Sequence, residues 1–224
     1  MRSGEYDGHP QDYVLWLPKA HSLPEIEGLR SGDLYETDEA PMRATPWPLE
    51  VVDESAIGPE LDGAIRRLLC ECFPADAEAF ARSRAWHGER PSFVVLCREG
   101  NAVVGHLAIV IRVVSIGGVR ARVAGVQGLS VTPRCRAGGL ARELLRLAQG
   151  ELAARGVRSG ILFCLPELEA FYGRLGWQKT ERPVTTRDEE GQPILLSAKN
   201  ICMLSVLEDA TLPPGPIDLG CRDW

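Results

Sequence analysis

No stretch of this 224-residue sequence is apolar over the roughly 20 residues that a helix needs to span a bilayer. The first residues also lack the basic start and the apolar segment of a secretion signal, because Glu5, Asp7 and Asp12 surround Pro10. The sequence therefore predicts a cytoplasmic protein that has no membrane as a partner.

Cysteine pairs with the spacing of metal ligands are missing as well. The seven cysteines include no C-x-x-C pair, and only four histidines are scattered along the chain. We therefore expect no metal site. Most cysteines are predicted to be small core residues in a reducing compartment.

The chain has no excess of basic residues. Its 25 Lys and Arg stand against 31 Asp and Glu, which gives a formal net charge of −6. This balance disfavours nucleic acid as a partner, because binding to nucleic acid depends on neutralising phosphates. It tolerates, and weakly favours, a cationic small molecule as the substrate.

Regular structure is not expected at the start of the chain. Residues 1–48 contain six prolines, scattered acids and little hydrophobic periodicity, which predicts an N-terminal extension. The apolar patch at residues 13–17 predicts that part of this extension docks on the remainder. Residues 49–224 are predicted to form one domain.

Hydrophobic periodicity predicts helices and an antiparallel meander in the first half of that domain. The two helices and three strands are expected, in order, at Pro59–Cys72, residues 76–86, residues 93–97, residues 102–114 and Val119–Val131.

The second half is predicted to alternate between helices and strands. An amphipathic helix at residues 140–155 precedes a short, wholly apolar strand at residues 161–165. A strand, a helix and a buried strand in this order predict a parallel crossover. A helix from Pro166, a strand from Trp177 and a last strand at residues 201–207 are expected to follow.

The segment between the third strand and the amphipathic helix has the composition of a phosphate-binding loop. Ala137, Gly138 and Gly139 are small, so an anion can approach the backbone, and N–H groups at a helix start are unpaired. Arg134 and Arg136 add positive charge. An ordinary turn is the alternative, and the order of the surrounding elements favours a pyrophosphate site over it.

With these elements around that loop, the chain resembles the GCN5-related N-acetyltransferase (GNAT) superfamily from about Leu49 onward. Residues 134–139 look like its R-x-x-G-x-G/A loop, with Ala137 in place of the first glycine, and residues 171–177 look like its F-Y-x-x-x-G-F/W segment. The resemblance implies an α/β (α+β) fold. Its sheet would be mixed and mostly antiparallel, with a parallel, splayed central strand pair and flanking helices.

The resemblance also implies acetyl-CoA as the co-substrate. Backbone groups of Leu129 and Val131 would pair with the pantetheine arm, and the N–H groups after Arg134 would hold the pyrophosphate. The residues implied in binding acetyl-CoA are Leu129, Ser130, Val131, Arg136, Ala137, Gly138, Gly139, Leu140 and Ala141.

Acetyl transfer to an amine needs a neutral amine, a polarised carbonyl and a proton for the leaving thiolate. By resemblance, the N–H near Leu129 polarises the carbonyl and Tyr172 protonates the sulfur; plain packing of Tyr172 is the alternative. Gln127 stands where many relatives have a glutamate, and it can only orient water or substrate because an amide is not a base. The base is left open among Asp76, Asp218, Asp223, His106 and the terminal carboxylate of Trp224.

A finer resemblance concerns the acceptor. Aminoglycoside 2'-N-acetyltransferases share the pair Gly105-His106, the strand end at residues 127–131, and an acidic tail that closes with Trp. This resemblance implies an amino-sugar antibiotic, such as kasugamycin, as the acceptor, and several carboxylates at fixed distances would suit such a cation. The residues implied in binding it are Asp76, Gln127, Gly128, Asp218, Asp223 and Trp224.

Other functions stay open. The nodulation acyltransferases share the histidine-containing strand and the W-x-G-x-R-P pattern at residues 86–91, which favours a fatty-acyl or other small-amine N-acyltransferase. Gln127 and Ala137 leave a non-catalytic acyl-CoA-binding sensor open, although Tyr172 and the acidic tail favour an enzyme. A homodimer is left open too.

Overall fold

The computed structural model describes residues 47–196, 200–206 and 210–224. The predicted extension at residues 1–48 therefore lies outside the described residues, apart from its last two. The docking predicted for residues 13–17 lies outside them as well.

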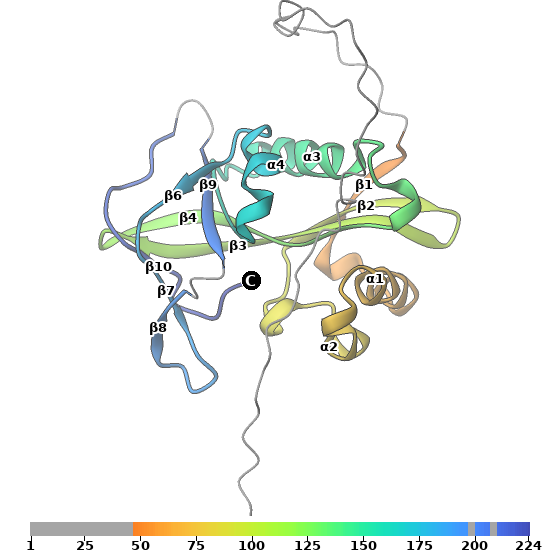
Figure 1. The fold of residues 1–224 in the computed structure, drawn as a ribbon, viewed down its shortest axis with the longest axis horizontal. Coiled ribbons are helices and arrows are strands. Elements are labelled where there is room, and N and C mark those ends of the chain that lie inside the picture. Colours follow the sequence, from red (N-terminus) through yellow and green to blue (C-terminus); the bar gives the residue numbers. More distant parts are fainter. Residues whose placement is uncertain (1–46, 197–199, 207–209) are drawn as a thin grey trace, which may run out of the picture.

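Ten strands form one mixed sheet with helices on both faces (Figure 1). The path of strands is β6-β9-β5-β4-β3-β10-β7-β8, and β2 joins β1 to β3. Only β4 with β5 and β10 with β7 pair in parallel among the described strands. The strands are β1 Leu49–Asp53, β2 Phe93–Glu99, β3 Ala102–Ile116, β4 Val119–Val131, β5 Ser159–Cys164, β6 Gln178–Thr180, β7 Val184–Arg187, β8 Pro193–Leu195, β9 Ile201–Val206 and β10 Ile217–Asp218.

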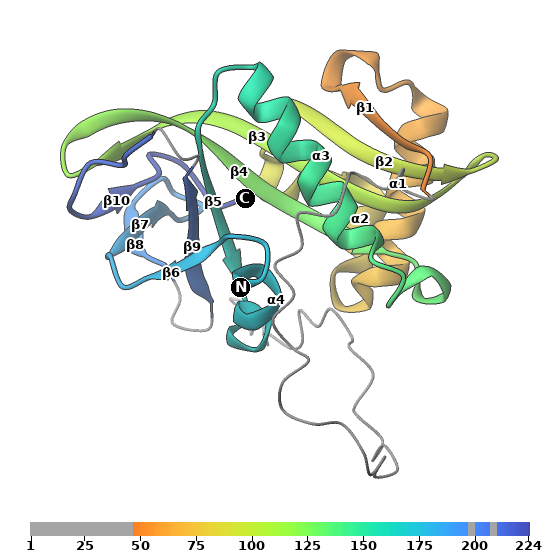
Figure 2. The ribbon, with the colours of Figure 1, turned by 90° about the horizontal axis from the view of Figure 1, so that it is seen from above.

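The helices form two layers. α3 and α4 cover one face of the sheet, and α1 and α2 lie on the other (Figure 1). Figure 2 shows α3 running across β2, β3 and β4. The helices are α1 Pro59–Cys72, α2 Ala77–Arg82, α3 Leu140–Ala154 and α4 Glu169–Gly173. Within the described ranges, no helix combines the length and apolarity needed to cross a membrane.

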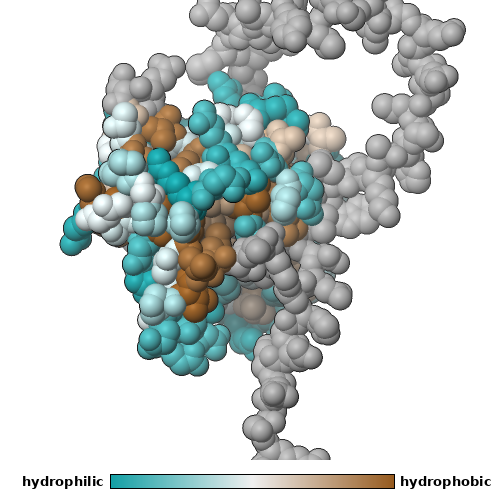
Figure 3. All heavy atoms as spheres, turned by 60° about the vertical axis from the view of Figure 1, so that its left-hand side comes forward, coloured by the Kyte–Doolittle hydropathy of each residue, from teal (hydrophilic) through white to brown (hydrophobic). Residues whose placement is uncertain are grey.

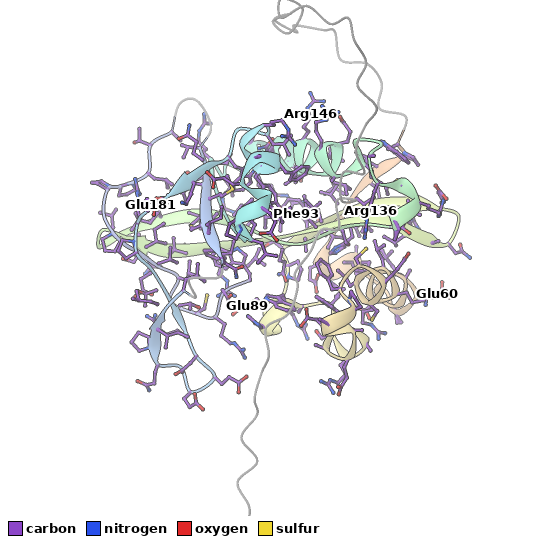
Figure 4. All side chains as sticks on the ribbon, viewed as in Figure 1. Glu60, Glu89, Phe93, Arg136, Arg146 and Glu181 are labelled. Carbon is purple, nitrogen blue, oxygen red and sulfur yellow. The ribbon has the colours of Figure 1, made fainter. Side chains whose placement is uncertain are left out.

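Strand β2 explains why this sheet is buried on both faces. Successive strand residues point to opposite sides. Phe93 and Val95 pack in the cluster that contains α3, whereas Val94 and Leu96 pack in the cluster that contains α1. Each fully buried side chain of this size stabilises the fold by roughly 1.5–3 kcal/mol, so the two layers hold the sheet from both sides. Figure 4 shows Phe93 within the sheet.

Most predicted elements are confirmed, with one clear error. α1 and β4 have the predicted bounds, and the parallel crossover from β4 through α3 to β5 is present. The helix predicted for residues 76–86 is wrong after Arg82, because Ser83 is extended (φ −151°, ψ 140°) and ends α2. The chain then makes an irregular loop that carries Trp86 and His87, and this loop matters for the site.

The outer surface is mixed in character. Exposed large apolar side chains include Val119 at the β3–β4 turn and Ile194 and Leu195 on β8. On the face drawn in Figure 3, apolar residues (brown) lie between hydrophilic ones (teal).

Candidate active site

Strands β4 and β5 are paired at one end only. Their ladder consists of Ala124 opposite Gly160 and Gly125 opposite Ile161, with no further pair along the described strands. From Val126 onward the two strands diverge. This confirms the splayed parallel pair that the family resemblance implies.

A cavity of 320 Å³ occupies the opening between the diverging strands. It is lined by residues 126–129 of β4 and by residues 162–165 at the end of β5. Phe73, Phe80 and Trp86 close it from the side of α1 and α2, so most of its wall is apolar or aromatic. Ligand sites span roughly 300–1,000 Å³, so this cavity suits a small ligand.

A β-bulge shapes the β4 wall of this cavity. Opposite β3, His106 pairs with Ser130 and Ala108 with Gln127, so two β4 residues face one β3 residue. Gly128 in the bulge has φ 60°, which favours glycine. A bulge leaves a residue out of the ladder. It thereby brings the backbone of Gly128 and Leu129 to the cavity that both residues line.

His106 is buried beside the bulge and is 1% exposed. Its Nδ1 lies 2.8 Å from the Gly128 carbonyl oxygen, so Nδ1 carries the proton and donates. Nε2 is buried without a hydrogen-bond partner among the described residues. Burial lowers the pKa of His106 to about 4, against the opposing effect of the Gly128 bond, and Arg84 lowers it further. His106 is therefore neutral at pH 7, and it lines the cavity.

Both polar atoms of the Gln127 side chain are hydrogen-bonded within the protein. Its Oε1 accepts a hydrogen bond from the Trp86 N–H at 3.0 Å, and its Nε2 donates to the Glu89 carbonyl at 3.0 Å. Gln127 thus ties β4 to the loop after α2. A glutamate could not donate the second bond.

Tyr172 reaches the cavity from α4 and is 5% exposed. Burial raises its pKa, and the neighbouring Cys164 adds to that shift. The hydroxyl therefore keeps its proton at neutral pH, as a proton donor requires. Tyr172 also packs edge-on against Trp177, so it is at once a core residue and a wall of the cavity.

Cys164 lines the same cavity. Burial raises the pKa of its thiol to about 12, with smaller contributions from Glu169 and Glu167. The thiol is therefore protonated at neutral pH, and a protonated thiol is a poor nucleophile.

Asp76, Asp218, Asp223 and the terminal Trp224 were the residues expected to bring carboxylates to the acceptor. Of these four, Asp223 and Trp224 line the cavity. Asp223 Oδ1 lies 2.7 Å from His87 Nδ1. Asp76 does not line the cavity; burial raises the pKa of its carboxyl, against the opposing effect of His87. Asp218 is elsewhere: it lies in β10, and its ion pair with Arg187, at 2.9 Å, lowers its pKa.

The predicted phosphate loop leads from β4 into α3, and Figure 4 shows Arg136 in it. Ala137 has φ 63° and Gly139 has φ 78°, so both adopt the left-handed conformation. The Trp47 Nε1 donates to the Gly138 carbonyl at 3.3 Å. The loop is therefore a tight turn that ends at the first N–H groups of a 15-residue helix.

The charges at this loop differ from those expected. Arg134 is paired with Glu99 at 2.6 Å, and Arg136 donates from Nε to the Val131 carbonyl at 3.1 Å. Arg142, which sequence reasoning missed, is the closer cation: a Cβ added at Gly139 would lie 3.2 Å from its Nη2. The sequence signal for Arg142 was its position in the first turn of the helix that follows the loop.

The loop after α2 supplies the other missed residues. Arg84, Trp86 and His87 all line the cavity. The W-x-G-x-R-P pattern marked this loop, but only the fold brings it to β4. In the described part of the chain, no three His, Cys, Asp or Glu side chains are grouped so that they could hold a metal ion.

The model of the acetyltransferase (GNAT) domain family matches residues 60–180, more than half of the chain. The chain belongs to this family, which makes it an acetyltransferase by class and confirms the resemblance to the superfamily. No curated protein matches the sequence significantly.

Solved structures share the fold. The chain is similar to the GNAT family N-acetyltransferase YhbS from Escherichia coli in complex with CoA, with a TM-score of 0.57, 19% identity, and 80% of this chain and 93% of that chain covered. For Escherichia coli ElaA the TM-score is 0.51 and the identity 14%, with 71% of this chain and 99% of that chain covered. For a GNAT family acetyltransferase from Brucella melitensis in complex with acetyl-CoA the TM-score is 0.50 and the identity 20%, with 75% of this chain and 94% of that chain covered. At these identities the likeness shows the fold alone.

Proposed function

We propose that this chain is an acetyl-CoA-dependent N-acetyltransferase whose acceptor is a small amino-sugar antibiotic of the size of kasugamycin. The observation that carries the proposal is the cavity between the diverging strands β4 and β5. It brings together the bulge at Leu129, the protonated hydroxyl of Tyr172 and the carboxylate of Asp223.

The donor is acetyl-CoA, with its pyrophosphate on the loop before α3. The N–H groups from Ala137 to Ala141 lie at the positive end of the helix dipole, whereas the Arg136 N–H donates to the Pro133 carbonyl at 3.3 Å, and Arg142 adds a cation. Where β5 leaves β4, the backbone of residues 129–131 has an edge that a pantetheine amide can pair with, as a strand would. The thioester then reaches the cavity.

In the reaction, the amine attacks the thioester carbonyl and a tetrahedral intermediate forms. The N–H of Leu129 in the bulge stabilises its oxyanion, because a donor fixed in an apolar site is effective there. The C–S bond then breaks, and Tyr172 gives its proton to the thiolate. Removal of Tyr172 as an acid should therefore slow the chemical step without weakening the binding of CoA.

The amino sugar is held by one carboxylate and by aromatic rings. Asp223 pairs with an ammonium group, and Trp86 and Trp224 offer faces to the apolar side of a sugar ring. With a volume of 320 Å³ and one acidic side chain in its lining, the cavity favours a small acceptor over a polycation of several rings.

The aromatic wall also favours a second candidate acceptor, a small apolar or aromatic amine. A fatty-acyl donor and a non-catalytic acyl-CoA sensor are the remaining alternatives. The cytoplasmic location, the division of the chain near residue 49 and a homodimeric assembly stay predictions from the sequence.

The test is release of CoA thiol from acetyl-CoA with kasugamycin, glucosamine, multi-ring aminoglycosides and a small aromatic amine, with the products weighed by mass spectrometry. We expect acetylated kasugamycin, and slower turnover of the multi-ring compounds. Turnover confined to the aromatic amine would contradict the amino-sugar acceptor. Tight binding of acetyl-CoA with no turnover of any amine would favour the sensor.

A further inference from the structure

A histidine and an aspartate form a pair at the rim of the cavity. His87 Nδ1 lies 2.7 Å from Asp223 Oδ1, and both residues line the cavity. A carboxylate only accepts hydrogen bonds, so Nδ1 must donate and the neutral ring keeps its lone pair on Nε2. Nε2 has no hydrogen-bond partner among the described residues.

We propose that His87, oriented by Asp223, is the base that takes the proton from the attacking amine. The proposal rests on the N-acetyltransferase function proposed above. It assigns a role to a residue that neither the loop motif nor the tyrosine motif contains, and it supplies the base that Gln127 cannot be.

The loop around His87 is held in place from several sides. His87 itself adopts a left-handed conformation (φ 46°, ψ 25°), which a non-glycine residue adopts only when its surroundings enforce it. Its ring packs on Trp86 at 4.6 Å between centroids, and Trp86 stacks on Phe80 at 5.4 Å. Gln127 binds the backbone on both sides of His87, at Trp86 and Glu89. Gln127 is therefore a positioning residue.

Two carboxylates lie near His87. Asp223 contacts the ring, and Asp76 interacts with it from the start of α2. Arg84 also lines the cavity, but Glu54 and Asp62 pair with it at 2.6 and 2.9 Å. Burial lowers the pKa of His106 to about 4, so this second histidine is a weak base.

The proton balance closes with two residues. As the N–C bond forms, Nε2 of His87 takes a proton from the amine nitrogen; as the C–S bond breaks, Tyr172 gives a proton to the sulfur. His87 then releases its proton to solvent, which its 30% exposed side chain can reach. The Tyr172 phenolate takes a proton back from solvent after the products leave. The net products are the amide and the CoA thiol.

The test compares His87→Gln and Asp223→Asn with the wild type and with Glu78→Gln, an exposed ion-pair change on α2. We expect His87→Gln to lower kcat for kasugamycin by about 10²–10⁴-fold, the usual range for a positioned base, without a change in KM for acetyl-CoA. Added imidazole should restore part of the rate. Hydroxylamine should lose much less, because it is a weakly basic acceptor whose nitrogen gives up its proton with less help once the N–C bond forms. Glu78→Gln should keep the wild-type rate.

Nitrogen-15 NMR of the His87 ring gives a second readout that needs no acceptor. We expect a proton on Nδ1 and none on Nε2 in the neutral ring, and a shift of the proton toward Nε2 in Asp223→Asn. A neutral ring with its proton on Nε2 would overturn the proposal, and so would a full rate in His87→Gln. If His87→Gln lowered kcat equally for kasugamycin and hydroxylamine, and imidazole restored neither rate, His87 would have a structural role. Absence of wild-type turnover with every acceptor would instead contradict the proposed function, and the NMR result would still decide the protonation of His87.

Discussion

The indole ring of Trp224 lies against the backbone of Gly125, so closely that a Cβ added at Gly125 would overlap the ring. Gly125 belongs to the last paired position of β4 and β5 before the strands diverge. The ring of Trp224 also packs on the ring of Phe163, with 5.8 Å between the ring centroids. Trp224 therefore closes the narrow end of the cavity, and the absence of a side chain at position 125 makes room for it.

Gly125→Ala should displace Trp224 from this position. We expect it to lower the free energy of unfolding by about 1–3 kcal/mol, as overpacking does, and to raise KM for the acceptor more than KM for acetyl-CoA. Urea unfolding and steady-state kinetics measure both. The matched control is Gly150→Ala in α3, where a new Cβ meets no atom within 4 Å; it should stabilise by about 1 kcal/mol. Unchanged stability and KM in Gly125→Ala would contradict the role given to Trp224.

Arg142 should contribute to binding of the donor. Its guanidinium lies beside Gly139 and makes no ion pair with a described residue, so it is available to a phosphate. We expect Arg142→Gln to weaken CoA binding by about 10- to 100-fold, the equivalent of one charge-assisted hydrogen bond, as measured by calorimetry. Arg146→Gln, one turn further along α3 (Figure 4), is the control and should bind CoA normally. Equal affinities for the two variants would exclude Arg142 from the phosphate site.

Ala137 is strained where the family motif has glycine. Its φ of 63° costs a residue with a Cβ roughly 1–2 kcal/mol. We expect Ala137→Gly to stabilise the protein slightly in urea unfolding, because relief of strain outweighs the added freedom of the unfolded chain, and to keep or improve CoA affinity. Ala153→Gly on the exposed side of α3 is the opposite control and should cost about 1 kcal/mol. A loss of stability in Ala137→Gly would contradict the strain.

His106 should make the fold sensitive to acid. Its folded pKa of about 4 lies below the roughly 6.5 of an unfolded histidine, so between these pH values the unfolded state binds more protons. Stability should therefore fall as the pH drops from about 6.5 to 4, by on the order of 3 kcal/mol from this group. Urea unfolding at several pH values measures the slope. His106→Gln should flatten it, and an unaltered slope would contradict the buried, neutral state.

The sequence predicts the elements whose signal is periodic and local. α1 and β4 are long enough for their burial pattern to be read, and the glycine-rich loop and Tyr172 lie in motifs of fixed spacing. β10 has two residues, Ile217 and Asp218, and exists only because β3 and β7 offer it partners. No local pattern reveals such a strand.

The same limit applies to the predicted site. Asp218 and Asp223 are five positions apart and both acidic, yet Asp218 in β10 pairs with Arg187 of β7, whereas Asp223 lines the cavity. His87 lies 136 positions before Asp223, so their contact is a property of the fold. The role of Asp223 stays a prediction, and no sequence pattern indicates its contact with His87.

The most direct test of the proposed function is the turnover of acetyl-CoA with kasugamycin by the wild type and by Tyr172→Phe. The wild type should release CoA thiol and form the acetyl amide. Tyr172→Phe should bind CoA equally well but turn over about 10²–10⁴-fold more slowly, because the leaving thiolate lacks its proton donor. A wild-type rate in Tyr172→Phe, or no acetylated product from the wild type, would contradict this function.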